Sequence, residues 1–339
     1  EVFENIAAIY EEEGSDCWFS DDPQKFLGSK YKAGDFDKLK DIVEAWFDSG
    51  STHSFVLEKR EDLKWPASMY LEGSDQHRGW FHSSLLESCG TRGRAPYESI
   101  LSHGFVMDGK GLKMSKSLGN QIFPEDILKK YGADILRVWV AASDYSEDLR
   151  IDYSILDQHA EAYRKIRNTF RYLMGNINDN YSEQQYNKID LSKLPELEKL
   201  MLHKLYVLNE KFNTNFKEYN FHALYKELLN FCTVDLSSFY FDIRKDTLYC
   251  DNKNSEKRQN CILILKTILD ALLKWFAPIL SFTTEEIFNL LNQDEKNSIH
   301  LKKFPEFPKS WKNEELNNNW EKINKIRDIT NISIEEKRA

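Results

Sequence analysis

The feature of this 339-residue sequence that most restricts its fold is a change in the spacing of apolar residues near residue 150. Residues 45–150 consist of short apolar stretches separated by glycines and turn-forming residues, which is typical of alternating strands and helices. The rest of the chain repeats apolar residues with the period of amphipathic helices, most clearly over 153–177, 195–217, 221–243 and 256–276. We therefore expect an α/β fold followed by an all-α fold, in more than one domain.

Strand and helix signals alternate in the α/β region. The segment MYLEG predicts a short buried strand over 69–73, a turn and helix follow over 73–90, and residues 99–108 predict a second strand. The segment PEDILKKYG predicts a helix over 124–132 that begins with proline and ends at glycine. This order of strand, helix, strand, loop and helix is typical of a parallel α/β sheet.

Two helices carry recognisable end signals. For the helix after the first strand, the pattern predicts Ser74 or Asp75 as the N-cap and Gly90 as the stop. For a short helix near 284–292, a threonine followed three residues later by glutamate, Thr283 and Glu286, predicts a capping box.

The most hydrophobic stretch is CILILKTILDALLKWF, residues 261–276. Lys266, Asp270 and Lys274 interrupt it at four-residue spacing, which predicts one charged stripe along an amphipathic helix. No stretch is apolar for the length that a bilayer requires.

The overall composition limits which cellular compartments and which classes of binding partner are expected. The formal net charge of −9 argues against indiscriminate binding of polyanions, although a local basic patch can still meet one nucleic acid. Five scattered cysteines without a CxxC pair predict neither a zinc site nor a disulfide framework. We expect a cytoplasmic protein, and because the chain opens at Glu1 without a signal peptide, we interpret it as an excerpt of a longer polypeptide.

The segment KGLKMSKSLGN, residues 110–120, places lysines and serines between glycines directly after a predicted strand. A lysine ammonium is a mobile point charge that suits phosphate oxygens, and the glycines allow the backbone to swing. The loop is therefore predicted to close over a nucleotide triphosphate. For two lysines near a glycine, the ordinary alternative is a solvated surface loop, but the complete KMSKS sequence favours the nucleotide interpretation.

A second candidate site is LEGSDQHRGWF, residues 71–81, where a strand meets a helix. Ligands of open α/β sheets bind at the carboxyl ends of strands, so Glu72 is a candidate for an amino group and Asp75 for ribose hydroxyls. In the alternative interpretation, Asp75 caps the helix and Glu72 pairs with Arg78. The tryptophan of EAWFDSGSTH (44–53), Trp46, and Trp80 are more often core residues than pocket walls.

Together these stretches resemble the class I aminoacyl-tRNA synthetases, and among them the bacterial isoleucyl type. The stretches that carry the resemblance are EAWFDSGSTH, YLEGSDQHRGWFHSSL, GTRGRAPYESILSHGF, KMSKSLGN, YGADILRVWVAASDYSEDLR and YRKIRNTFRYLMGN. KMSKS also occurs in the valyl and leucyl types, so the LEGSDQHRGWF segment indicates the isoleucyl type more specifically. The resemblance is dense over 42–177 and looser toward the end of the chain.

The resemblance implies a domain for each part of the chain. Residues 1–44 would be the end of an inserted editing domain and its return connection, and residues 45–150 the second half of a Rossmann-type catalytic domain with the KMSKS loop. Residues 151–318 would form a helical anticodon-binding domain, and residues 319–339 the start of a C-terminal extension.

The resemblance also implies roles for individual residues. Lys116 and Lys113 would be catalytic, and Trp46 and Trp80 would flank the isoleucine side chain. The ATP and adenylate would contact Glu72, Gly73, Asp75, Gln76, Lys113, Met114, Ser115, Lys116 and Ser117. The implied substrates are L-isoleucine, ATP with Mg²⁺, and tRNA(Ile), in a monomer without zinc in this chain.

One predicted helix presents a cationic face. In HAEAYRKIRNTFRYLMGN (159–176), Arg164, Arg167 and Arg171 lie opposite apolar side chains at helical spacing. The family context favours contact with tRNA phosphates. The alternative is a solvated face whose arginines pair with acids such as Glu161.

The chain departs from the family pattern in one respect that bears on activity. The first class I signature, a HIGH-like tetrapeptide, does not occur, and neither Ser102-His103-Gly104 nor Ser51-Thr52-His53 supplies it. Most of the editing domain and a cysteine-rich zinc module are also missing, so we expect residues 1–339 to be inactive alone. Rival interpretations are a non-catalytic tRNA-binding module and a generic nucleotide-binding protein with a helical cap.

Overall fold

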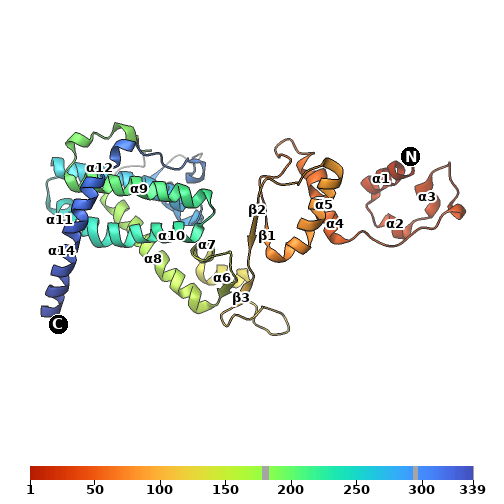
Figure 1. The fold of residues 1–339 in the computed structure, drawn as a ribbon, viewed down its shortest axis with the longest axis horizontal. Helices are drawn as coiled ribbons and strands as arrows, with labels where there is room; N and C mark the ends of the chain where they lie inside the picture. Colours follow the sequence, from red (N-terminus) through yellow and green to blue (C-terminus); the bar gives the residue numbers. More distant parts are fainter. Residues whose placement is uncertain (178–182, 293–296, 339) are drawn as a thin grey trace. The chain divides into compact units, whose positions relative to one another are not determined.

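The computed structural model describes residues 1–177, 183–292 and 297–338. The chain divides into two compact units, Glu1–Ser102 and His103–Ala339, which are described separately below (Figure 1). In the part of the chain that the structure describes, no helix has both the length and the hydropathy needed to cross a membrane. All five cysteines carry free thiols.

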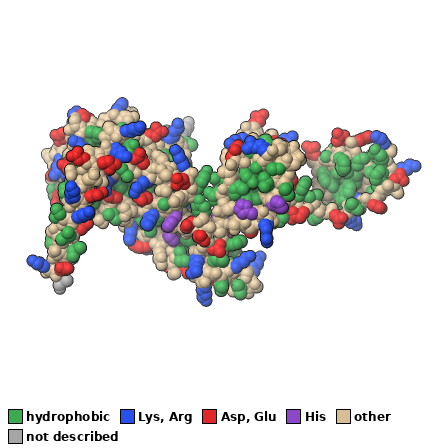
Figure 2. All heavy atoms as spheres, in the orientation of Figure 1, with side chains coloured by type: hydrophobic (Ala, Val, Ile, Leu, Met, Phe, Trp, Pro, Cys, Tyr) green, Lys and Arg blue, Asp and Glu red, His purple; other side chains and the backbone are tan. Residues whose placement is uncertain are grey.

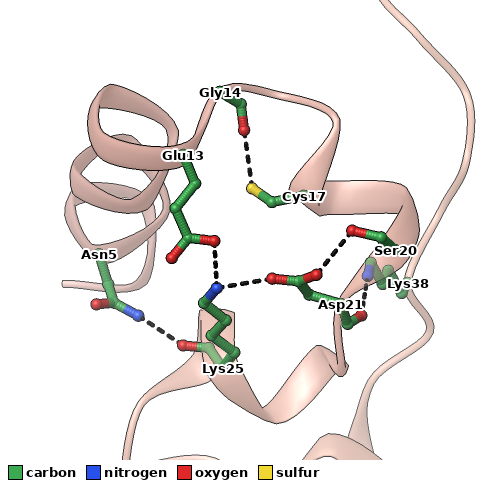
Figure 3. A network of polar contacts seen from close by, with 8 residues as sticks. All are labelled: Asn5, Glu13, Gly14, Cys17, Ser20, Asp21, Lys25 and Lys38. Atoms are coloured by element: carbon green, nitrogen blue, oxygen red, sulfur yellow. Dashed lines mark hydrogen bonds and ion pairs between the residues drawn. The ribbon is translucent and has the colours of Figure 1, made fainter.

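The first unit begins with three short helices, α1 (Val2–Glu13), α2 (Cys17–Ser20) and α3 (Pro23–Leu27). Figure 3 shows how polar contacts join them: the Lys25 ammonium lies 2.5 Å from the Glu13 carboxylate and 2.6 Å from that of Asp21. The Asn5 amide donates to the Phe26 carbonyl at 2.8 Å, and the Phe26 ring is buried. These contacts fix α1 against α3.

The rest of this unit contains α4 (Ala45–Gly50), β1 (Tyr70–Gly73), α5 (Trp80–Arg92) and β2 (Ile100–His103). Strand β1 pairs with β2, and a parallel bridge between Ala67 and Tyr97 extends the pairing. At Gly50, α4 approaches α5 so closely that a Cβ atom would lie 2.7 Å from the Ser84 backbone nitrogen. The predicted strand at 69–73 and the helix after it are therefore confirmed.

The predicted ends of that helix are wrong. A 3₁₀ turn, Ser74–Arg78, precedes α5 and has no side-chain cap, so neither Ser74 nor Asp75 serves as the N-cap. The helix continues through Gly90 and ends at Gly93, which adopts the left-handed conformation with φ = 73°. The left-handed residue required at this end is glycine because it has no Cβ to clash, and Gly90 is tolerated as an ordinary helical residue.

Large hydrophobic side chains are exposed on the first unit. Figure 2 shows hydrophobic side chains gathered on its surface. The exposed large hydrophobic residues between α3 and the end of α4 include Phe36, Leu39, Ile42, Val43, Trp46 and Phe47. An apolar surface of this kind is typical of a contact region.

The second unit opens with β3 (Val106–Asp108), α6 (Pro124–Tyr131), α7 (Ala133–Ala142) and β4 (Leu149–Ile151), and β3 runs parallel to β4. The helix predicted at 124–132 is confirmed, with Pro124 first and Gly132 as its C-cap.

The single strand predicted over 99–108 is instead two strands, β2 and β3. The chain turns at Gly104, whose amide donates to the Tyr145 carbonyl at 2.9 Å. A Cβ atom at Gly104 would lie 2.3 Å from the Glu147 carbonyl oxygen, so this close approach requires glycine.

The rest of the described unit contains seven α-helices, with short 3₁₀ turns between some of them: α8 (Tyr153–Asn176), α9 (Glu196–Lys217), α10 (Phe221–Asn230), α11 (Asp242–Cys250), α12 (Glu256–Phe276), α13 (Ser281–Leu291) and α14 (Glu314–Arg338). A π-helical stretch, Phe231–Phe241, joins α10 to α11. A large apolar core holds α8 to α13 together, and a smaller cluster packs α6 and α7 against β4 and the start of α8. The predicted α/β part followed by a helical part is therefore confirmed.

The charged stripe predicted along 261–276 is wrong for two of its three residues. Asp270 is 1% exposed and Lys274 4% exposed, and their side chains form an ion pair at 3.1 Å within α12. Helix α12 is covered on nearly all sides by its neighbours. Buried charges of opposite sign are tolerated there because they neutralise each other.

The capping box predicted at Thr283 is also wrong. Helix α13 begins two residues earlier, at Ser281, and its preceding residue provides no side-chain cap. The Asp134 carboxylate of α7 accepts the free amides of Phe282 and Thr283 instead, at 3.2 and 2.8 Å. The helix end is therefore capped through tertiary structure, which a local pattern does not reveal.

Candidate functional site

The lysine loop, residues 109–120, leaves strand β3 through a tight hairpin. The Asp108 carboxylate accepts the backbone amides of Lys110 and Leu112 at 3.0 and 2.8 Å, and Gly111 supplies the required positive φ of 79°. A bridge between Met107 and Lys113 then returns the chain alongside β3. The backbone at the start of the loop is thus fixed by hydrogen bonds.

The end of the loop is held by Asn120, a residue that the sequence analysis missed. Its amide nitrogen donates to the Asp108 carboxylate at 2.9 Å and to the Lys113 carbonyl at 3.3 Å, and its oxygen accepts the Ser115 amide at 3.0 Å. The bond from Asn120, followed by the backbone amides, holds the pKa of Asp108 below its usual range. The only sequence signal was an asparagine following a glycine, Gly119, which proves to have φ = 61°.

The tip of the lysine loop carries an unpaired positive charge. Lys116 is exposed, and its ammonium makes no hydrogen bond or ion pair with any residue that the structure describes. The Lys113 ammonium lies 5.7 Å from the centre of the Phe105 ring. The hydroxyls of Ser115 and Ser117 contact each other at 3.1 Å, while Met114 packs against the cluster around Trp139. The Lys116 ammonium is therefore accessible, and it lies on a loop whose two ends are held by hydrogen bonds.

Gly109, the glycine directly before KGLKMSKSLGN, lies in close contact with another part of the unit. A Cβ atom there would lie 2.0 Å from a carboxylate oxygen of Asp152, the residue that caps α8. Glycine is needed at this position because the loop sits directly against the start of that helix.

In the first unit, the predicted acidic residues lie around the end of β1. Glu72 is half-buried on the strand, and its carboxylate accepts the adjacent Gly73 amide at 3.2 Å. The carboxylate of exposed Asp75 contacts the Gln76 amide at 3.2 Å. Neither carboxylate forms an ion pair with a described residue, so the proposed pairing of Glu72 with Arg78 is not seen. Both carboxylates remain available to a ligand.

The two predicted pocket tryptophans lie on the adjacent helices α4 and α5. Trp46 is 42% exposed, so the expectation that it belongs to the core is wrong. Trp80 is half-buried and its ring lies 4.8 Å from that of Tyr70. No ring contact joins the two indoles in the described part of the first unit. A stacked pair is therefore not preformed.

The cationic face predicted on α8 is present, and its three arginines differ in their contacts. Arg164 pairs with exposed Glu161 at 2.9 Å, as the alternative interpretation expected. Arg167 donates to the Tyr163 hydroxyl at 3.0 Å. Arg171 makes no hydrogen bond or ion pair with the described residues. The opposite face is buried, with Ile166, Phe170 and Leu173 at most 1% exposed.

A hollow lies beside this face, between α8 and α13, with a volume of about 490 Å³. Arg167 and Arg171 line it together with Glu286, over an apolar floor that includes Met174 and Leu290. Guanidinium groups around an apolar floor are suited to phosphates and unstacked bases of RNA.

Comparison with known proteins identifies the family. The model for tRNA synthetases class I (I, L, M and V) matches residues 1–152, and the model for the anticodon-binding domain of tRNA ligase matches residues 198–339. The chain is 73% identical over 338 residues to an isoleucine–tRNA ligase of Pelagibacter ubique and 49% identical over 339 residues to one of Mesorhizobium japonicum. The chain belongs to the class I aminoacyl-tRNA synthetases.

Both class I relatives are much longer than this chain, which spans 37% of the first and 34% of the second. Solved class I synthetase structures share the fold. One is the ternary complex of Agrobacterium radiobacter K84 agnB2 LeuRS with tRNA and LeuAMS (TM-score 0.59, 16% identity, covering 73% of this chain and 29% of that one). Another is the Mycobacterium tuberculosis methionyl-tRNA synthetase bound by methionyl-adenylate (TM-score 0.59, 18% identity, covering 74% and 50%).

Proposed function

We propose that this chain forms the KMSKS part and the tRNA-binding helical part of an isoleucine–tRNA ligase. The high identity to ligases of that name along the whole chain supports the assignment. The substrates are L-isoleucine, ATP with Mg²⁺, and tRNA(Ile). Mg²⁺ is carried mainly by the ATP phosphates, as is usual for this ion.

The first reaction is adenylate formation. An isoleucine carboxylate oxygen bonds to the α-phosphorus of ATP while the bond from that phosphorus to the bridging oxygen breaks, and the electron pair leaves with pyrophosphate. In-line displacement of this kind depends on positioning and on neutralising the charge that develops on the leaving group. The exposed Lys116 ammonium is available for this, and Lys113 assists from the anchored base of the loop.

We assign the other roles in substrate binding to individual residues of the first unit. Glu72 and Asp75, with Gly73 and Gln76, take the amino group and the ribose, and Trp46 and Trp80 flank the isoleucine side chain. Discrimination against valine through one methylene is limited to about 1–3 kcal/mol, a figure for which this family is itself the standard example.

The second reaction transfers isoleucine to the 3′ end of tRNA and releases AMP. We assign Arg164, Arg167 and Arg171 to tRNA phosphates. The match of the following helices to an anticodon-binding domain supports an RNA surface here. The predicted domain boundaries at residues 44, 150 and 318, the monomeric state and the cytoplasmic location remain parts of this proposal.

The observation that carries the proposal is the exposed Lys116 ammonium, which has no partner among the described residues and lies at the tip of the KMSKS loop. Its test uses a chimera in which residues 1–339 replace the matching segment of the Pelagibacter ubique relative. Lys116→Ala should slow isoleucine-dependent ATP–pyrophosphate exchange about 10²–10³-fold with little effect on isoleucine binding. Lys110→Ala, which removes an exposed lysine outside KMSKS, is the control. Near-normal exchange in the Lys116 variant would refute the assignment.

A further inference from the structure

A chain of hydrogen bonds connects the core of the second unit to one arginine of the α8 face. It begins at Asp134 on α7, which is 7% exposed and caps α13. The Thr283 hydroxyl donates to the same carboxylate at 2.6 Å and contacts the Tyr163 hydroxyl at 2.9 Å. The Arg167 guanidinium in turn donates to the Tyr163 oxygen at 3.0 Å.

The groups present determine the direction of each hydrogen bond in the series from Asp134 to Arg167. An ionised carboxylate only accepts, so the Thr283 proton must point to Asp134. The Thr283 oxygen can then only accept from the Tyr163 hydroxyl. Because a guanidinium only donates, Arg167 must donate to the Tyr163 oxygen. All the protons point toward Asp134, and hydrogen bonds aligned in this way polarise and strengthen one another.

The carboxylate at the end of this chain is itself rigidly held. One turn further along α7, the Arg137 guanidinium donates to the carbonyls of Ile279 and Pro278, at 3.0 and 2.6 Å, just beyond the end of α12. Asp134 therefore contacts the amides that begin α13, and Arg137 contacts carbonyls that follow α12. Each charge has the sign that suits its helix end. The corner between α12 and α13 is thereby fixed to α7.

We propose that Asp134, Thr283 and Tyr163 form a positioning relay that holds the Arg167 guanidinium in place for a tRNA phosphate. The inference rests on the proposed tRNA binding. It assigns a role in RNA affinity to three residues that need not touch RNA.

Comparison of the three arginines supports this role. Arg164 must break its ion pair with Glu161 before it can bind a phosphate. Arg171, which has no hydrogen bond or ion pair with the described residues, must lose side-chain freedom when it binds. Arg167 donates one N–H to Tyr163, an uncharged partner, and forms no ion pair with Glu286, which lines the same hollow. Four N–H groups therefore remain for phosphate oxygens. A guanidinium that is already oriented loses less side-chain freedom when it binds. Arg167 is therefore the arginine best prepared for the ligand.

The test is a titration of the 339-residue chain with tRNA(Ile) transcript over a range of salt concentrations. Tyr163→Phe removes one oxygen and keeps the ring, and should weaken binding about 3- to 10-fold. Thr283→Val should have a similar effect, whereas Thr283→Ser, which keeps the hydroxyl, should bind like the parent. Arg167→Ala should weaken binding and lower the salt slope by about one.

The double variant separates positioning from general damage. In the Arg167→Ala background, Tyr163→Phe should have no further effect on affinity, because the group it positions is gone. An equal loss in both backgrounds, or no loss in Tyr163→Phe alone, would overturn the relay.

A measurement without RNA separates the relay from the proposed function. The ¹⁵N resonance of Arg167 Nε, assigned by its loss in Arg167→Lys, should show faster guanidinium motion in Tyr163→Phe than in the parent. Unchanged motion would contradict the relay even if tRNA binds. Failure of the parent chain to bind tRNA, with the motion changed as expected, would instead refute the proposed function.

Discussion

Asn120 joins the two ends of the lysine loop through a single amide side chain. Its nitrogen reaches Asp108 before the loop and Lys113 within it, and its oxygen reaches Ser115. Because the same side chain both donates and accepts, neither a carboxylate nor an apolar residue can replace it. The position of Lys116 therefore depends on a residue outside the KMSKS sequence.

The first prediction at this scale concerns that amide. In the chimera, Asn120→Ala should slow ATP–pyrophosphate exchange about tenfold, since the loop loses hydrogen bonds whose net value is about 1 kcal/mol each. Isoleucine binding should be unchanged. Leu118→Ala, which truncates an exposed side chain of the same loop, is the control, and an equal effect of both changes would contradict the special role of Asn120.

A second prediction at the residue scale concerns pH. His203 is buried on α9, and its Nδ1 accepts the Asn313 amide at 2.9 Å, which requires that nitrogen to be unprotonated. Burial, more than the nearby lysines, lowers the pKa of His203. The unfolded chain then binds the proton more readily, so stability should be full above about pH 6.5 and fall as the pH decreases toward the lower folded pKa.

The measurement is the urea midpoint of the 339-residue chain at several pH values between 5 and 8. His203→Asn keeps an acceptor near the Nδ1 position without titrating, and should flatten the acid side of the profile. The same pH dependence in the parent and the variant would rule out His203 as its source.

Among whole elements, α9 and α11 are joined by a buried ion pair. The Arg244 guanidinium contacts both carboxylate oxygens of Glu198, at 2.7 and 2.6 Å, and the Glu198 side chain is fully buried. Arg244→Met should cost about 3–5 kcal/mol in the free energy of unfolding, because it leaves a buried carboxylate without its partner.

The control is the double change Glu198→Leu with Arg244→Met, which replaces the pair with apolar side chains and should recover most of that loss. Urea unfolding of the three proteins measures both effects. If the double variant were as unstable as Arg244→Met, packing and not charge would explain the loss.

The sequence predicted elements better than it predicted their ends and surroundings. Apolar periodicity located α8, α9, α12 and α13, because that pattern is local. The single helix that it predicted over 221–243 is instead α10 followed by the π-helical stretch, and α11 was not predicted. The periodicity assigned Asp270 and Lys274 to a solvated stripe, since it carries no information about how many neighbours cover a helix. The cap of α13 was missed for the same reason, because its carboxylate, on Asp134, comes from a distant part of the chain.

The candidate site was predictable to a similar extent. The lysines of the loop follow from the KMSKS motif, whereas Asn120 and Tyr163 have no distinctive local pattern and act through hydrogen bonds that only the fold creates. For Trp46, the general tendency of tryptophan to be buried was wrong, since this side chain is 42% exposed, while its predicted place in an isoleucine pocket stays a prediction.

At the scale of the whole molecule, the chain spans 37% and 34% of the length of its two relatives. We expect the 339 residues alone to bind tRNA(Ile) without catalysing ATP–pyrophosphate exchange, because the first class I signature does not occur in them. The chimera should restore exchange that depends on isoleucine. Robust exchange by the chain alone would contradict this expectation.

The contact between Gly109 and Asp152 has a mechanical consequence for such an enzyme. The two residues are so close that not even a methyl group fits between them, and Asp152 is the N-cap of α8. If RNA binding at the α8 arginines moved the start of α8 toward Gly109, the hairpin that contains Gly109 would have to move with it, because no free space separates them. We therefore expect any displacement of the start of α8 toward Gly109 to change the position of Lys116 as well.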